Sequence, residues 1–169
     1  DVCCCNLLLD AIARERFGEP FDKDGELASK GKVDEGVYGE LTALLSSQHH
    51  DKQSLGHLDD IGRHLSTWKD VPSEVLAATA CVAIGDCIST SVGDADCVYL
   101  AGGGCHNKTL ASHIRGDGTV AELGVPVQAR EGVAMAILGA LHQDGVSITL
   151  PQVTGRSEST KPVGFAQES

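Results

Sequence analysis

The chain has 169 residues, of which 41% are hydrophobic and 22% charged, and its formal net charge is −11. This length and composition predict a folded domain with a core, while the negative charge argues against nucleic acid or an anionic membrane as the main partner. The longest apolar run is interrupted by Asp86 and is too short for a bilayer, so we expect no membrane span.

The first third of the chain predicts helices separated by glycine-rich and polar loops. Apolar residues recur at helical spacing from Asn6 to Phe17, and Gly18 and Pro20 follow them. We then expect a loop with at most one helical turn, a helix, a polar loop that contains His49 and His50, and a weaker helix; their ranges are 21–31, 35–45, 46–53 and 55–68.

The remainder alternates between helix and strand. We expect a central helix from Ser73, its N-cap, to about Val92, because its apolar face is nearly continuous. A buried strand, a short helix, a second strand and a strong helix should follow, over 96–101, 107–114, 119–122 and 126–142. The predicted fold class is therefore α/β, rich in helix and with a small sheet.

Three consecutive glycines, Gly102, Gly103 and Gly104, follow the first predicted strand. A plain tight turn would explain them. Alternatively, the backbone here approaches a bulky ligand such as a nucleotide, which the free N–H groups of a following helix would face. In the second case His106 either approaches that ligand or faces solvent.

The seven cysteines include the adjacent Cys3, Cys4 and Cys5, and no pair has the C-x-x-C spacing of a zinc or redox site. No basic region followed by an apolar stretch opens the chain, so we expect a cytoplasmic or organellar location and reduced, mostly buried thiols. Four histidines between 49 and 64 invite a metal site, but nothing completes the ligand set, so we favour a solvated loop.

Several segments, in fixed order, match motifs of one enzyme family. Asp1 and Asn6 match the ends of D-T-G-P-x-N, and residues 21–31 match F/Y-D-x-D-G-x-x-A-x-x-G. Further matches are to P-P-K-S-x-G, G-G-G-x-x-N, E-A-x-x-F-A and L-P-x-V-T-G, at 54–56, 102–107, 129–136 and 150–155. The chain thus resembles anhydro-N-acetylmuramic acid kinase, a member of the actin, sugar kinase and Hsp70 superfamily.

The resemblance implies an incomplete ribonuclease H-like lobe over residues 1–155, followed by a polar tail over 156–169. It also implies a reaction in which ATP and Mg²⁺ serve to open the anhydro ring of an amino sugar and phosphorylate it, in peptidoglycan recycling. Asp1 would be the general base, Gly102, Gly103, Gly104 and Asn107 would bind the nucleotide, and Asn6 and Glu131 would contact the sugar.

The departures from the family motifs leave two hypotheses open. The first phosphate loop, G-T-S-x-D-G, is absent, and Val2 and the three adjacent cysteines replace T-G-P-x. The chain is then either the C-terminal lobe of a kinase, completed by an N-terminal lobe or another chain, or a non-catalytic binding module, a pseudoenzyme packed in an assembly. Asp1 is either the base or a frayed end, and Glu131 either faces the sugar pocket or lies exposed.

Asp22, Asp24 and Gly25 form a D-x-D-G sequence like the start of a calcium loop. Such a loop would need an oxygen ligand at Pro20 and a glutamate at position 31, which is Gly31, so we predict a structural turn in which both aspartates accept backbone N–H groups.

Overall fold

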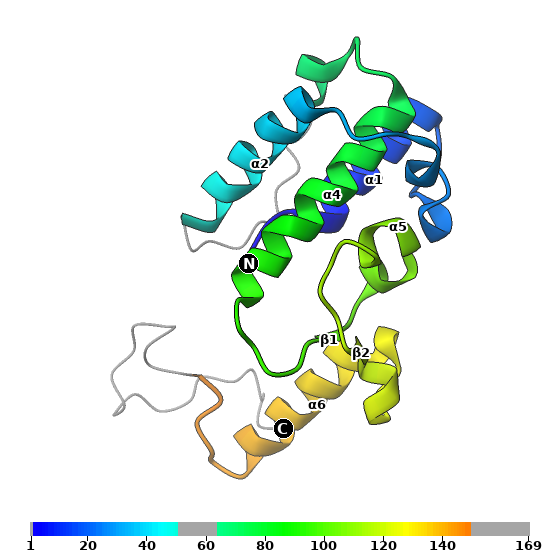
Figure 1. Ribbon diagram of the computed structural model, residues 1–169. Helices are drawn as coiled ribbons and strands as arrows, with labels where there is room; N and C mark the ends of the chain where they lie inside the picture. The colour runs from blue at the N-terminus through cyan, green and yellow to red at the C-terminus, as the bar shows by residue number, and fades with distance from the viewer. Residues whose placement is uncertain (1, 51–63, 150–169) are drawn as a thin grey trace. The chain divides into compact units, whose positions relative to one another are not determined.

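The computed structural model describes residues 2–50 and 64–149 (Figure 1). It divides into two compact units, Asp1–Val127 and Gln128–Ser169, each of which is described by itself below. Asp1, most of the helix predicted at 55–68 and the tail predicted at 156–169 lie outside the described residues. Within them, the chain is mostly helical and has one two-stranded parallel sheet.

The core of the first unit forms where three helices meet. These are α1 (Cys5–Phe17), α2 (Glu35–His50) and α4 (Ser73–Val92), and α4 contacts both of the others (Figure 1). Small side chains such as Ala80 and Cys81 let the neighbouring helices approach α4 closely, while Leu76 and Ile84 are fully buried. The predicted central helix is confirmed, and it ends at Val92 as expected.

Two predicted helix boundaries are wrong. The helix α2 continues to His50, where a polar loop was expected from residue 46, because polar residues such as Ser46 and Ser47 on an exposed face do not end a helix. The Ser47 hydroxyl also donates to the Leu44 carbonyl in the same turn, at 2.7 Å. Ser73 is the first helical residue of α4 rather than its cap, a position that Pro72 takes.

Polar side chains tie the three helices together. The Tyr38 hydroxyl donates to Asp86 Oδ2 at 2.7 Å, which gives a partner to the carboxylate inside the apolar helix α4, and this bond raises the pKa of Tyr38. The Arg16 guanidinium donates to the carbonyls of Trp68 and Lys69, at 2.6 and 3.0 Å. Such bonds from a charged group hold the segment before α4 against α1.

The sheet is smaller than the sequence predicts. Strand β1 (Tyr99–Leu100) pairs in parallel with β2 (Gly118–Thr119), so most of the strand predicted over 96–101 is irregular, and Tyr99 is 39% exposed rather than buried. The second strand prediction, over 119–122, is largely wrong. Glu122 accepts from the Thr119 backbone N–H at 2.8 Å in a capping box, which turns the chain into a 3₁₀ helix at Val120–Leu123.

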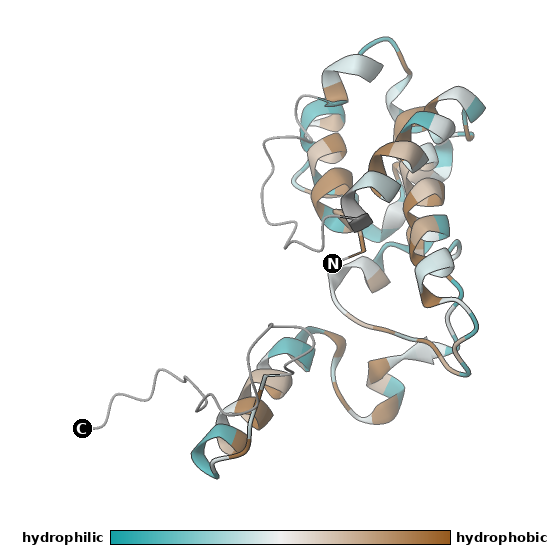
Figure 2. Cartoon of the chain, turned by 90° about the vertical axis from the view of Figure 1, so that its left-hand side faces the viewer, coloured by the Kyte–Doolittle hydropathy of each residue, from teal (hydrophilic) through white to brown (hydrophobic). Residues whose placement is uncertain are grey.

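Two helices complete the described chain. The single-turn α5 (Lys108–Ala111) belongs to the first unit, and α6 (Arg130–Gln143) to the second. A 3₁₀ turn at Val127–Ala129 replaces the start of the helix predicted from 126. No residue of α6 is buried, and its apolar residues, brown in Figure 2, include Met135 at 67% exposure.

Among the described helices, α4 alone is long and apolar enough to cross a membrane by length and composition. Half of that stretch is buried inside the structure. Its contacts with α1 and α2 are those of a core helix.

Replacing Leu76 by Ala should lower the free energy of unfolding by about 2–5 kcal/mol, because the side chain is fully buried in α4 and its removal leaves a cavity. The matched control is Leu123→Ala, since Leu123 is 60% exposed and the same truncation there should cost less than about 0.5 kcal/mol. Urea unfolding followed by circular dichroism measures both; equal losses would contradict the assignment of α4 as the centre of the core.

Candidate functional site

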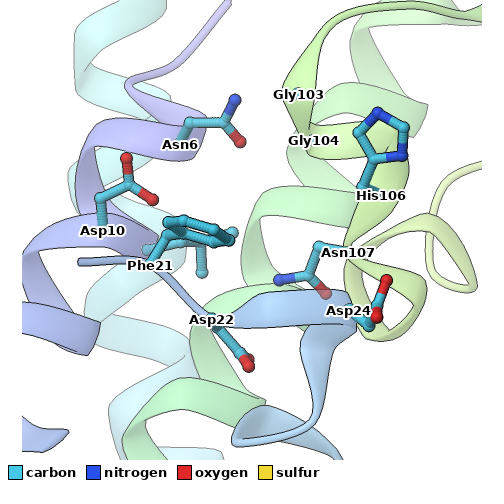
Figure 3. A pocket seen from close by; sticks show the side chains of 10 residues that line it. Asn6, Asp10, Phe21, Asp22, Asp24, Gly103, Gly104, His106 and Asn107 are labelled. Carbon is cyan, nitrogen blue, oxygen red and sulfur yellow. The ribbon is translucent and has the colours of Figure 1, made fainter. Parts of the chain in front are cut away.

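A pocket of about 280 Å³ opens in the first unit between the start of α1, the loop after it and the glycine segment (Figure 3). Its lining comes from three stretches that are far apart in the sequence. These residues are Asn6, Leu9 and Asp10 from α1, Phe21, Asp22 and Asp24 from the loop, and Gly103, Gly104, His106 and Asn107 from the glycine segment.

The glycine segment turns sharply and then presses against α1. Gly102 has φ +87°, in the left-handed region that favours glycine, and begins the turn into a 3₁₀ helix at Gly103–His106. A Cβ atom on Gly104 would lie 3.1 Å from Asn6 Oδ1, and one on Gly103 would lie 3.8 Å from Asn6 Nδ2. Close approach to Asn6 therefore accounts for glycine at 104, and Gly102 itself does not line the pocket.

Asn107 is a structural cap as well as part of the pocket wall. Its side-chain oxygen accepts from the Leu110 backbone N–H at 2.9 Å, and the residue is only 8% exposed. The helix that it caps, α5, has four residues. The Asn107 side chain therefore already satisfies the Leu110 N–H, one of the helix-start groups that could otherwise face a ligand, and the expectation that this segment binds a nucleotide stays a prediction.

The D-x-D-G turn is fastened to the glycine segment. Asp22 accepts from the backbone N–H groups of Leu27 and Ala28, at 2.8 and 3.0 Å, which confirms its predicted role as a structural acceptor. Gly25 has φ +75° and is buried, and a Cβ atom there would collide with Asn107 Oδ1 and approach the Thr109 backbone nitrogen within 2.8 Å. The Thr109 hydroxyl donates to the Gly25 carbonyl at 2.8 Å.

Asp24 was predicted to accept backbone N–H groups as Asp22 does. Within the described part of the chain, no hydrogen bond to its side chain is found, and the carboxylate instead lies on the pocket wall. Its φ is +56°, a left-handed conformation that aspartate tolerates better than most residues.

The pocket is rich in carboxylates and lacks cationic Lys and Arg side chains. Partial burial raises the pKa of Asp10, and nearby Arg14 opposes that shift. Phe21 exposes 53% of its surface at the rim. Carboxylates and amides suit hydroxyl and N–H donors, and an exposed ring offers a stacking surface, so the wall fits an uncharged polar ring better than an anion.

The structure brings together four of the residues singled out from the sequence: Asn6, Gly103, Gly104 and Asn107. Glu131 lies in the first turn of α6, in the other unit, where its side chain is 85% exposed and accepts from Arg130 at 3.4 Å. The sugar-binding role of Glu131 and the catalytic role of Asp1, which lies outside the described residues, stay predictions.

Sequence reasoning overlooked Asp10 and Phe21 as site residues. Asp10 follows Asn6 by four positions on a predicted helix, so spacing alone places both on one face. Phe21 sits beside the D-x-D-G motif, but only the folded chain shows its ring at a pocket rim.

The described residues include no group of three or more His, Cys, Asp and Glu side chains that could jointly hold a metal ion. Both Asp22 oxygens already accept backbone N–H groups, which leaves that carboxylate poorly placed to bind a cation. The side chains of His49 and His50 and all of His57 lie outside the described structure, and His64 is exposed.

The cysteines behave as small core residues. Burial raises the pKa of Cys3 and Cys81 to about 12 and that of Cys5 to about 11. Cys4 is 5% exposed, and its carbonyl accepts from the Leu7 backbone N–H at 2.8 Å as α1 begins. All seven are free thiols, but the expectation that they are mostly buried is wrong: only Cys4 and Cys81 are buried, and Cys97 is exposed.

Comparison with known proteins shows the class to which this fold and pocket belong. The family model of anhydro-N-acetylmuramic acid kinase matches residues 1–164. Proteins of that name from Shewanella loihica and Shewanella woodyi are 32% and 33% identical over 176 and 174 residues. These alignments cover 92% and 90% of this chain but only 46% and 45% of the relatives, so the chain spans about half of their length.

This chain belongs to the anhydro-N-acetylmuramic acid kinase family, whose members are ATP-dependent kinases of peptidoglycan recycling. The match covers the whole first unit, with the pocket described above, and residues 128–164 of the second.

Gly25→Ala should lower the free energy of unfolding by about 2–4 kcal/mol, because alanine disfavours the left-handed conformation and its Cβ atom would collide with Asn107. Gly18→Ala is the control: Gly18 has φ +72°, but nothing lies within 4 Å of an added Cβ atom, so about 1 kcal/mol should be lost. Chemical denaturation measures the difference. Equal effects would mean that the junction with Asn107 contributes nothing to stability.

Cys97 should react first with a thiol reagent at pH 8, since it is exposed, whereas the raised pKa values of Cys3, Cys5 and Cys81 leave little reactive thiolate. Mass spectrometry of timed alkylation identifies the labelled sites, and the urea-unfolded chain, in which all seven thiols should react, is the control. Labelling of Cys3 or Cys5 as fast as Cys97 would contradict their packing in the core.

Proposed function

We propose that this chain is the C-terminal lobe of an anhydro-N-acetylmuramic acid kinase, an incomplete ribonuclease H-like lobe that acts with an N-terminal lobe. The observation that carries the proposal is the convergence of three family motifs on one pocket: Asn6, the turn at 22–25 and the segment at 103–107. These segments pack together although up to about a hundred residues separate them, as a shared ligand site requires.

The pocket best fits the nucleoside end of ATP. Asp10, Asp22 and Asp24 line it with no Lys or Arg side chain, so a phosphate chain would be repelled, and so would the carboxylate of a sugar acid. The ribose and base are uncharged, carry hydroxyl and N–H donors for carboxylates, and offer a face that can stack on Phe21.

The phosphates would therefore lie outside this pocket, toward groups of the N-terminal lobe. Mg²⁺ would enter with ATP, because the described residues form no site of their own for it. Phosphoryl transfer depends on positioning and on neutralising charge. A lobe that holds only the nucleoside end would leave both tasks to its partner.

The sugar chemistry would fall to Asp1 and Glu131, which do not line the pocket, and to Asn6, which does. Asp1 would accept a proton from the water that attacks the anomeric carbon of the anhydro sugar, which a carboxylate can do while stabilising the positive charge that develops there. Glu131 and Asn6 would contact the amino sugar. These roles follow from the family motifs at those positions.

A second candidate function is that of a non-catalytic module, in which the lobe only binds other proteins. The cysteines favour this candidate. Where the family motif has T-G-P-x, this chain has Val2 and three cysteines, of which Cys4 is packed in the core. Side chains here occupy positions where backbone would approach a phosphate. The triple variant Val2→Thr, Cys3→Gly, Cys4→Pro restores the motif.

Isothermal titration with MgATP, on the chain alone and with the complementary half of the Shewanella loihica kinase, tests the proposal. We expect binding that adenosine competes away and inorganic triphosphate does not. Phe21→Ala should weaken it by about tenfold through lost stacking, and Leu123→Ala, at another exposed site, should leave it unchanged. Competition by triphosphate alone would contradict the assignment of the pocket to the nucleoside.

Turnover of the anhydro sugar by the two halves together separates the two candidates. The kinase proposal expects turnover, and a higher rate from the variant with the restored motif. If the two halves associate but bind ATP neither with the natural chain nor with the triple variant, the non-catalytic module is the candidate that remains.

A further inference from the structure

The three carboxylates that line the pocket differ in their partners. Both oxygens of Asp22 accept backbone N–H groups, from Leu27 and Ala28, at 2.8 and 3.0 Å, so this side chain holds the turn. Asp10 and Asp24 also line the pocket, and among the residues that the structure describes none donates a hydrogen bond to either carboxylate. Two carboxylates of the pocket are therefore available to accept from a ligand.

Asp10 is positioned by the helix on which it lies. It follows Asn6 by four residues on α1, so the two side chains share one face of that helix, and both line the pocket (Figure 3). Partial burial raises the pKa of the Asp10 carboxyl, and the charge of Arg14 opposes this shift. A carboxylate that has lost water without gaining a hydrogen bond favours a ligand that brings donors.

Asp24 belongs to the other side of the pocket. It precedes Gly25, where an added Cβ atom would collide with Asn107, so Asp24 lies where the turn meets the glycine segment. Figure 3 shows Asp10 and the ring of Phe21 on the α1 side. A base stacked on Phe21 carries a ribose bonded directly to it, and Asp10 and Asn6 are the polar groups that α1 presents to that ribose.

The chemistry of adenosine makes the ribose the better partner for a carboxylate. Adenine offers one amino group beside a ring nitrogen whose lone pair a carboxylate repels, whereas guanine offers two parallel N–H donors. A carboxylate at the base would therefore select guanine, but the kinases of this family use ATP. The 2′ and 3′ hydroxyls of ribose are two adjacent donors, and one carboxylate can accept from both.

The neighbouring hollow of the first unit lacks such acceptors. It measures about 270 Å³ and lies between α4, the segment 98–101 and α5, and no charged side chain lines it. Asn6 and Gly104 line both hollows, so they form the wall between them. The carboxylates that could accept from a pair of hydroxyls are therefore confined to the pocket side of this wall.

We propose that Asp10 is a specificity-determining residue of the pocket, whose carboxylate binds the 2′ and 3′ hydroxyls of the ribose and so selects ribonucleotides over deoxyribonucleotides. The inference rests on the proposed function, since it takes the pocket to hold the nucleoside end of ATP. A 2′-deoxyribose brings only one of the two donors, so it leaves one oxygen of a partly buried carboxylate without a partner. Loss of such a partner weakens binding more than loss of a contact at an exposed site does.

Isothermal titration of the 169-residue chain, together with the complementary half of the Shewanella loihica kinase, compares MgATP with its 2′-deoxy analogue. We expect the Kd of the analogue to be at least about tenfold higher. Asp10→Asn, which removes the charge and keeps the shape, should reduce this ratio to about threefold or less. Asp24→Asn is the matched control, because it makes the same change on the other side of the pocket and should leave the ratio unchanged.

Two further titrations separate the ribose from other sources of hydroxyl groups and from the phosphates. Adenosine and 2′-deoxyadenosine should show the same ratio as the two nucleotides, since the proposed contact involves the ribose alone. N-acetylglucosamine, an uncharged amino sugar, should not displace adenosine. Displacement would mean that the hydroxyls in the pocket belong to the sugar substrate, and the assignment of Asp10 to the ribose would be wrong.

Equal affinity for ATP and its 2′-deoxy analogue would overturn the inference and leave the proposed kinase function standing. A ratio that survives both Asp10→Asn and Asp10→Ala, or that falls with Asp24→Asn instead, would also overturn it. The comparison of ligands uses the unaltered chain, so it stands even if a variant misfolds. A preference for adenosine over 2′-deoxyadenosine in a chain that binds no MgATP would uphold the inference about the ribose while the proposed function fails.

Discussion

The junction between Gly25 and the glycine segment is the constraint on which the pocket depends. The Gly25 carbonyl accepts from Thr109, and the missing side chain makes room for Asn107, whose own oxygen caps α5. These contacts depend on one another. A shift of the loop at Gly25 would disturb Asn107, which caps α5, and a shift of α5 would remove the Thr109 hydroxyl from the Gly25 carbonyl. The pocket walls are therefore held by backbone contacts that only glycine at position 25 permits.

The two hollows of the first unit share a wall and differ in charge. Carboxylates dominate the pocket, which suits a polar, uncharged ligand, and uncharged side chains from α4, the segment 98–101 and α5 form the other hollow. Asn6 and Gly104 belong to both. A Cβ atom on Gly104 would lie 3.1 Å from Asn6 Oδ1, so the shared wall leaves little room for a side chain at position 104.

The cysteines show how this chain differs chemically from the motif that it resembles. Three adjacent thiols replace residues of a phosphate loop, and burial keeps the pKa of Cys3 and Cys5 far above neutral pH. They contribute packing at the start of α1 rather than reactivity. The side chains of Val2 and the three cysteines therefore stand where the motif has T-G-P-x.

The sequence by itself determined the helices and the family. Periodic apolar residues placed α1 and α4 correctly, since burial of one face is a local pattern, and ordered motifs indicated the kinase. Tertiary structure alone decided the extent of the sheet, because a strand needs a neighbour to pair with, and the place of Asp10 and Phe21 in the pocket. Convergence of distant segments depends on packing, which no local pattern of residues records.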